Sequence, residues 1–207
     1  MRAKRLPFSG KTPRSLIQRL SDDRPDDWAT FCGIYAPLIH KLTGRYSLQE
    51  SDADEVTAAV IKGLMQRFRT GFRIRTSKGW FRNYVATATQ NAVIAHRKRQ
   101  KRDHASSLDD HKLDSASLAP PDDLARLELH AQVRFCLDQL RNSPKTRRRN
   151  FLAFERYVIN GEPAKDVAKA YGLKVQRLYE IKREMLARLE TMLRDLGIDV
   201  REDLTCF

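Results

Sequence analysis

Apolar side chains recur three and four residues apart through most of the chain, a pattern that predicts amphipathic helices. The clearest stripe runs through residues 28–42, and a second follows through residues 56–68. A third begins at Trp80 and continues to Val93, after which comes the basic run Arg97–Arg102. The sequence has no run with the two-residue period of a strand. We therefore expect an all-α fold.

The second half of the chain has four more helical segments. Apolar stripes mark residues 124–140 and 151–158, and the second stripe closes at the pair Asn160-Gly161, a typical C-terminal stop. A short helix is predicted to start at Pro163. Gly172 interrupts that helix, and a long one follows. The pattern therefore predicts two successive groups of helices.

The distribution of charge suggests where the two groups are separated. Residues 1–102 carry 21 basic and 8 acidic side chains, residues 103–125 carry 1 and 6, and residues 126–207 carry 17 and 12. The middle part is rich in Ser, Asp and Pro and has no apolar period, as expected for a linker. We therefore predict a first helical domain over residues 12–102, a flexible acidic linker over 103–121 and a second helical domain over 122–196.

The formal net charge of +13 narrows the range of partners. A chain this basic usually binds nucleic acid or an anionic membrane surface. The sequence has no apolar stretch long enough to span a bilayer, and its N-terminus lacks the apolar core of a signal peptide. Cys32, Cys136 and Cys206 form no CxxC pair and are interpreted as reduced thiols. We therefore expect a soluble cytoplasmic protein that does not bind membranes.

The segment 163–185 has the spacing of a helix-turn-helix. Ala168 supplies the small residue needed where the two helices cross, and Gly172 supplies the positive φ needed in the turn. With Leu178 and Ile181 facing inwards, six polar side chains face outwards as a candidate recognition helix. They are Lys174, Gln176, Arg177, Glu180, Lys182 and Arg183. An ordinary helical hairpin with a charged face is the alternative interpretation.

A basic and aromatic segment in the first domain is a second candidate nucleic-acid site. Basic side chains bind phosphates and aromatic rings stack on unpaired bases, so the combination suits melted DNA. Trp80 and Phe81 have helical spacing, and a place in the core is an equally good interpretation for both. The basic candidates are Arg69, Arg73, Arg75, Lys78 and Arg97.

The sequence contains no recognisable catalytic constellation. Its five histidines show no metal-ligand spacing with cysteine. It also lacks a glycine-rich phosphate loop and a nucleophile elbow. We therefore expect a protein that is not an enzyme and that holds no metal or cofactor.

In this order, the motifs resemble the extracytoplasmic-function (ECF) sigma factors of RNA polymerase, members of the sigma-70 superfamily. The resemblance covers roughly residues 13–102 and 124–193, which are similar to sigma regions 2 and 4. Four motifs carry it. They are Trp28-x-x-Phe31-x-x-x-Tyr35-x-Pro37-Leu38, Asp52-Ala53-Asp54-Glu55-Val56, Trp80-Phe81-x-x-Tyr84 followed by Asn91, and the helix-turn-helix from Ala164 to Lys182.

The resemblance implies a factor that directs core RNA polymerase to promoters and helps to open them. Asp52, Asp54 and Glu55 would bind the clamp of the largest polymerase subunit, and the second domain would contact the second-largest subunit. The loop 69–78 and the helix after it, with Asn91 and Arg97, would hold the melted −10 element. The recognition helix would read the −35 element. An anti-sigma factor is a further partner that the resemblance suggests.

Two positions depart from the family pattern. Ala58-Ala59 stand where the family has a Gln-Glu pair, and Ala95 stands where it has an Asp. These differences raise the alternative of a member that has lost initiation activity. A stand-alone helix-turn-helix regulator that does not bind RNA polymerase is a second alternative. An RNA-binding structural protein is a third, supported only by the net charge.

Overall fold

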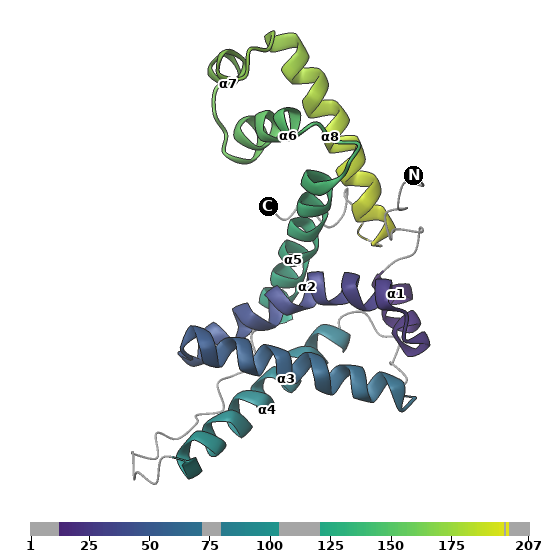
Figure 1. Ribbon diagram of the computed structural model, residues 1–207, viewed down its shortest axis with the longest axis vertical. Coiled ribbons are helices and arrows are strands. Elements are labelled where there is room, and N and C mark those ends of the chain that lie inside the picture. Colours follow the sequence, from purple (N-terminus) through teal and green to yellow (C-terminus); the bar gives the residue numbers. More distant parts are fainter. Residues whose placement is uncertain (1–12, 72–79, 104–120, 197, 199–207) are drawn as a thin grey trace. The chain divides into compact units, whose positions relative to one another are not determined.

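The computed structural model describes residues 13–71, 80–103, 121–196 and 198. In these ranges the regular secondary structure is helical and includes no strand, so the all-α prediction is confirmed (Figure 1). None of the helices in these ranges combines the length and the apolar surface that a membrane span requires. The chain divides into two compact units, one spanning Arg14–Ala131 and the other containing the described residues from Gln132 onwards.

The first unit is built from α1 (Pro13–Arg19), α2 (Pro25–Thr43), α3 (Glu50–Arg69), α4 (Trp80–Asp103) and the first half of α5 (Pro121–Asn142). Short 3₁₀ turns, η1 (Leu20–Asp22) and η2 (Gly44–Tyr46), follow α1 and α2. The start of α2 suits the helix dipole, because Pro25 occupies the first turn and two aspartates follow it.

An aromatic core holds α2, α3 and α4 together. Phe31 and Tyr35 of α2 are stacked with their ring centroids 4.6 Å apart. Phe81 of α4 meets the Tyr35 ring edge-on at 5.3 Å, and Phe68 of α3 lies 6.3 Å from Phe81. Such pairs contribute about 0.5–1.5 kcal/mol each beyond the burial of their surface. The predicted apolar stripes of residues 28–42 and 56–68 therefore do form the core.

The start of α3 is rich in acidic residues. The helix begins at Glu50, and Gln49 occupies the N-cap without a side-chain capping bond. Ser51 lies exposed in the first turn. The acids near the start of α3 still complement the positive end of the helix dipole.

The first half of α5 belongs to the first unit. Leu124 is buried there, and Glu128 accepts a hydrogen bond from the hydroxyl of Tyr35 at 2.7 Å. The boundary between the two units therefore falls inside α5, between Ala131 and Gln132. The sequence placed the start of the second domain at residue 122, because the end of the linker coincides with the start of this helix.

The second unit consists of the second half of α5, α6 (Arg148–Phe154), a π-helical segment η3 (Glu155–Ile159), α7 (Ala164–Ala170) and α8 (Val175–Asp195). Both α6 and α7 pack on α8 (Figure 1). Two apolar clusters form the core. One is Leu140, Phe151, Phe154, Ile181 and Met185, and the other is Ala153, Val167, Ala168 and Leu178.

The π-helical segment η3 widens the end of the helix that α6 begins. The amide of Asn160 donates to the carbonyl of Glu155 at 3.0 Å, which is the five-residue spacing of a π-turn. Gly161 then takes a φ of +70°, a left-handed conformation that a glycine adopts without strain. The predicted stop at Asn160-Gly161 is thereby confirmed.

Candidate nucleic-acid interface

A tight turn of four residues, 171–174, joins α7 to α8. Ala168 is 2% exposed, and its carbonyl accepts the amide of Leu173 at 2.8 Å. Gly172 has a φ of +59° in the tight turn. Ala168 therefore provides the close helix contact and Gly172 the left-handed turn residue, as the spacing predicted.

Buried residues determine which side of α8 faces outwards. Leu178 and Ile181 are 0% exposed and Met185 is 1% exposed. The other side carries the predicted recognition residues. Lys174, Gln176, Arg177 and Arg183 are exposed, while Glu180 and Lys182 are half-buried. The expected outward direction is therefore found at four of the six positions, and partly at the other two.

Arg177 has a partner on its own helix. Its guanidinium donates to a carboxylate oxygen of Glu180 at 2.8 Å, and the two side chains are 47% and 43% exposed. Exposed pairs of this kind contribute about 0–1 kcal/mol. A phosphate or a guanine edge can therefore replace Glu180 as the partner of Arg177 at little cost.

Lys182 lies against an aromatic ring. Its Nζ atom is 5.4 Å from the centroid of Tyr157, a residue of η3. Tyr179, three residues before Lys182 in α8, also lies near Tyr157, and the two ring centroids are 6.0 Å apart. The half-buried state of Lys182 follows from this cation–π arrangement.

Tyr179 was not among the predicted site residues. It is 50% exposed, one residue after the buried Leu178, in the N-terminal part of α8. The phase that places Leu178 and Ile181 inside also places residue 179 outside, so the signal was available in the sequence.

An ion pair closes the loop before α7. Arg156 of η3 forms hydrogen bonds to both carboxylate oxygens of Glu162, and its guanidinium lies 5.8 Å from the Tyr171 ring. The hydrogen bond from Arg156 lowers the pKa of the Glu162 carboxyl, with the positive charge adding to the effect. This pair links η3 to the segment that leads into the helix-turn-helix.

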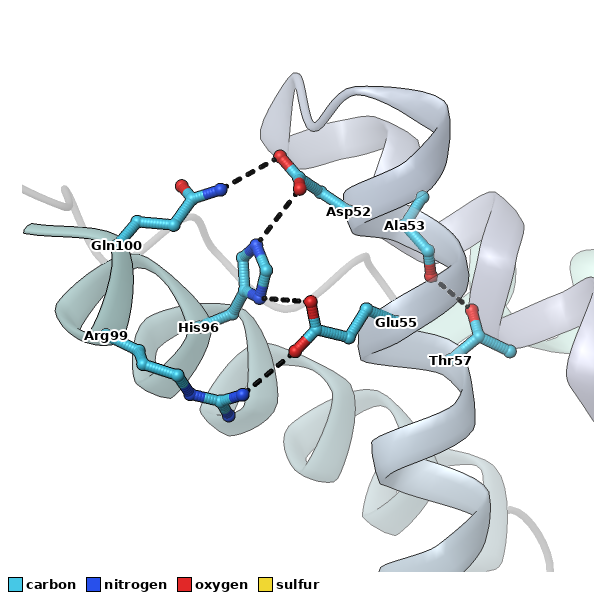
Figure 2. Close-up of polar contacts among 7 residues, drawn as sticks. All are labelled: Asp52, Ala53, Glu55, Thr57, His96, Arg99 and Gln100. Carbon is cyan, nitrogen blue, oxygen red and sulfur yellow. Dashed lines mark hydrogen bonds and ion pairs between the residues drawn. The ribbon is translucent and has the colours of Figure 1, made fainter. Parts of the chain in front are cut away.

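In the first unit, two of the three acids expected to bind polymerase face α4 (Figure 2). The imidazole of His96, whose side chain is only 6% exposed, lies 3.3 Å from Asp52 and 3.7 Å from Glu55. Arg99 donates to Glu55 at 2.9 Å, and Gln100 donates to Asp52 at 3.2 Å. These acids therefore join α3 to α4.

The third acid, Asp54, points away from this cluster. Its side chain is 72% exposed and lies 3.5 Å from His40 of α2. Ala58 and Ala59, further along α3, are exposed as well. Of the three acids, Asp54 and the half-exposed Glu55 are therefore accessible, while Asp52 is largely covered.

The residues expected to hold a melted strand lie in different environments. Phe81 is 7% exposed and belongs to the aromatic core, which answers the question that its spacing left open. Arg69 pairs with Asp23 at 3.0 Å, and Arg97 donates to the backbone carbonyl of Tyr46. Asn91 is exposed on α4. Arg73, Arg75, Lys78 and the side chain of Trp80 lie outside the described residues.

The described residues contain no group of histidine, cysteine and acidic side chains that is arranged to hold a metal ion. No protein-family model, curated protein or solved structure matches the chain.

Proposed function

We propose that the chain is a sigma-type factor, which directs core RNA polymerase to promoters and helps to open the DNA. The observation that carries this proposal is the helix-turn-helix of α7 and α8, with Lys174, Gln176 and Arg177 exposed at the start of α8. A net charge of +13 supports binding to a polyanion. The order of the motifs, with a region-2-like unit first, favours a promoter factor over other DNA-binding proteins.

In this proposal α8 enters the major groove of the −35 element. Side chains at the start of a recognition helix reach base edges, where arginine pairs with guanine and glutamine with adenine. The exposure of Gln176 and Arg177 at the start of α8 supports such contacts, in which Arg177 exchanges Glu180 for the base. Lys174 and Arg183 contribute phosphate contacts, which set the register of the helix on the duplex.

Promoter opening requires binding energy and no catalysis. The first unit exposes Asn91, Lys98 and Arg102 along α4. A row of polar and cationic side chains can follow the phosphate backbone of a bound strand. In the proposal this surface binds the melted −10 element, and the buried Phe81 supports the helix from behind.

The polymerase contact is proposed to centre on Asp54. Its carboxylate is the most exposed of the three acids, whereas Asp52 is 23% exposed and turned towards His96. Glu55 is half-exposed and is shared with Arg99. A basic surface on the clamp therefore meets Asp54 first, and it competes with α4 for the other two acids.

A stand-alone helix-turn-helix regulator is the second candidate. Two observations favour it: Asp52 and Glu55 are engaged with α4, and Ala58 and Ala59 present methyl groups where the ECF family has Gln and Glu. This candidate keeps the role of α8 and removes the role of α3.

In vitro transcription distinguishes the two candidates. The full chain is added to core RNA polymerase of its own host with a library of genomic promoters, and RNA start sites are sequenced. New starts that share spaced −35 and −10 elements support the sigma role. Duplex binding without new starts and without association with core enzyme supports the regulator. R177A is the matched control that removes a −35 contact and leaves α3 unchanged.

Substitutions on α3 test the polymerase contact directly. D54N is expected to weaken binding to core enzyme, and A58Q/A59E is expected to strengthen it. D138N, at an exposed acid of α5, has the same charge change and should leave binding unchanged. Equal affinities for all three variants and the unmodified chain would exclude α3 as the polymerase-binding surface.

A further inference from the structure

A pair of tyrosines next to the start of α8 has no role in the interface described above. Tyr179 is 50% exposed, and its ring lies 6.0 Å from that of Tyr157 with an angle of 49° between the ring planes. We propose that Tyr179 determines part of the DNA sequence preference by contacting the 5-methyl group of a thymine in the major groove. This inference rests on the proposed binding of duplex DNA by α8.

The position of Tyr179 on α8 suits a base contact. The helix begins at Val175, so Tyr179 lies in its second turn, and Leu178 beside it is fully buried. The N-terminal residues of a recognition helix are those that reach base edges. Residues 176 and 177 on the same stretch are polar and read hydrogen-bonding groups. Tyr179 adds an apolar surface, which is what a methyl group requires.

The support from Tyr157 distinguishes Tyr179 from an ordinary exposed aromatic residue. Tyr157 is half-buried in η3, and the ammonium of Lys182 lies 5.4 Å from its ring centroid. Tyr157 of η3 thus contacts α8 through both Lys182 and Tyr179, and it restrains the ring of Tyr179. A ring that is already restrained loses less conformational entropy when it binds.

The other exposed apolar side chains do not compete for this role. In the described residues, the exposed large apolar side chains besides Tyr179 are Ile159, at 49%, and Leu186, at 38%. Ile159 lies at the end of η3, and Leu186 lies two turns of α8 beyond Tyr179. Tyr179 is therefore the apolar contact that the start of α8 offers to a base edge.

The methyl group of thymine allows a direct test, because deoxyuridine differs from thymidine only in lacking this 5-methyl group. A preferred duplex is first selected with the full chain from a random duplex library. Each thymine of that duplex is then replaced by uracil, and affinities are measured at one salt concentration. We expect replacement at one or two positions to weaken binding about fourfold, the effect of losing one buried methyl group.

The variants assign this effect to Tyr179. Y179A should bind the thymine and uracil duplexes equally well, whereas Y179F, which keeps the ring, should retain the preference. I159A removes a similarly exposed apolar side chain and should behave like the unmodified chain. Circular dichroism of Y179A verifies that it is folded.

The possible failures are separable. If no duplex sequence is selected, the proposed function of α8 fails. If a sequence is selected and uracil is tolerated at every position, the inference about Tyr179 is wrong while the DNA-binding role stands. A preference for thymine that persists in Y179A also overturns the inference, because another residue then contacts the methyl group.

Discussion

The hydroxyl of Tyr35 donates a 2.7 Å hydrogen bond to the carboxylate of Glu128, 93 positions further along the chain. Arg82 lies 3.5 Å from the other oxygen of the same carboxylate. Tyr35 is 1% exposed, and burial followed by the nearby Glu128 charge raises the pKa of its phenol well above the usual value. One carboxylate therefore links α2, α4 and the first half of α5.

Removal of the Tyr35 hydroxyl tests this link. In Y35F the carboxylate of Glu128 loses a buried donor, so the free energy of unfolding is expected to fall by about 1–2 kcal/mol. Chemical denaturation measures the change. Y46F removes the same group from a half-buried tyrosine of η2 and is expected to change stability by less than about 0.5 kcal/mol. Equal effects of the two substitutions would contradict the importance of the Glu128 contact.

The same contact predicts where the first unit can be cut. A fragment of residues 14–131 keeps Leu124 and Glu128, whereas a fragment of residues 14–120 loses both. Burial of one leucine side chain contributes about 1.5–3 kcal/mol, so the longer fragment should unfold at a clearly higher temperature. Calorimetry of the two fragments provides the comparison. Identical melting temperatures would show that the first unit does not need α5.

Gly172 is expected to resist substitution because of its backbone conformation. Its φ is +59°, and a Cβ atom added there would meet nothing within 4 Å. The cost of G172A is therefore conformational, about 1 kcal/mol of destabilisation. G63A, within α3, also meets nothing within 4 Å and has no such φ, so it should stabilise the chain by about 0.5–1 kcal/mol. Denaturation curves should show effects of opposite sign.

The pair of Arg156 and Glu162 predicts a pH dependence. The folded chain lowers the pKa of Glu162 below its ordinary value of 4.5, so ionised Glu162 stabilises the fold. That contribution is complete above about pH 4.5 and is lost as the pH falls through the lowered value. The melting temperature of E162Q should therefore lie below that of the unmodified chain at pH 7, and the difference should shrink in acid. A constant difference would contradict the ion pair.

Cys136 is expected to be an unreactive thiol. Burial, with a smaller effect from Asp195, raises its pKa to about 12, so it stays protonated at pH 8. In the double variant C32S/C206S, iodoacetamide should label the folded chain slowly and the unfolded chain quickly, because the thiolate is the reactive form. Mass spectrometry follows the labelling. Rapid labelling under native conditions would show that this part of α5 opens readily.

The helices could be predicted from the sequence because a helix that is buried on one side has apolar residues three and four positions apart. Leu178, Ile181 and Met185 recur at helical spacing and are all buried in the structure. Gly172 was recognised as the turn residue because few other residues accept a positive φ. Local rules of this kind act within a few residues, and a single sequence contains all that they need.

Contacts between distant residues could not be predicted in the same way. The stripe that contains Leu124 indicated a helix, but it did not show that the first half of this helix packs with residues far earlier in the chain. The resemblance implied a partner for Asp52 and Glu55, but nothing in their own segment indicated that His96 and Arg99 of α4 would contact them. The positions of charged side chains follow no period that identifies their partners. An ion pair between distant residues is therefore seen only in the folded structure.

The five-residue turn of η3 has a consequence for how this interface can change in evolution. One α-helical turn takes 3.6 residues, so each residue inserted or deleted rotates the rest of a helix by about 100°. Deletion of Glu155 or Arg156, which precede Tyr157 in the segment, would therefore turn Tyr157 away from Tyr179. The orientation of this tyrosine therefore depends on the number of residues in the segment, and insertions and deletions can alter it where substitutions cannot.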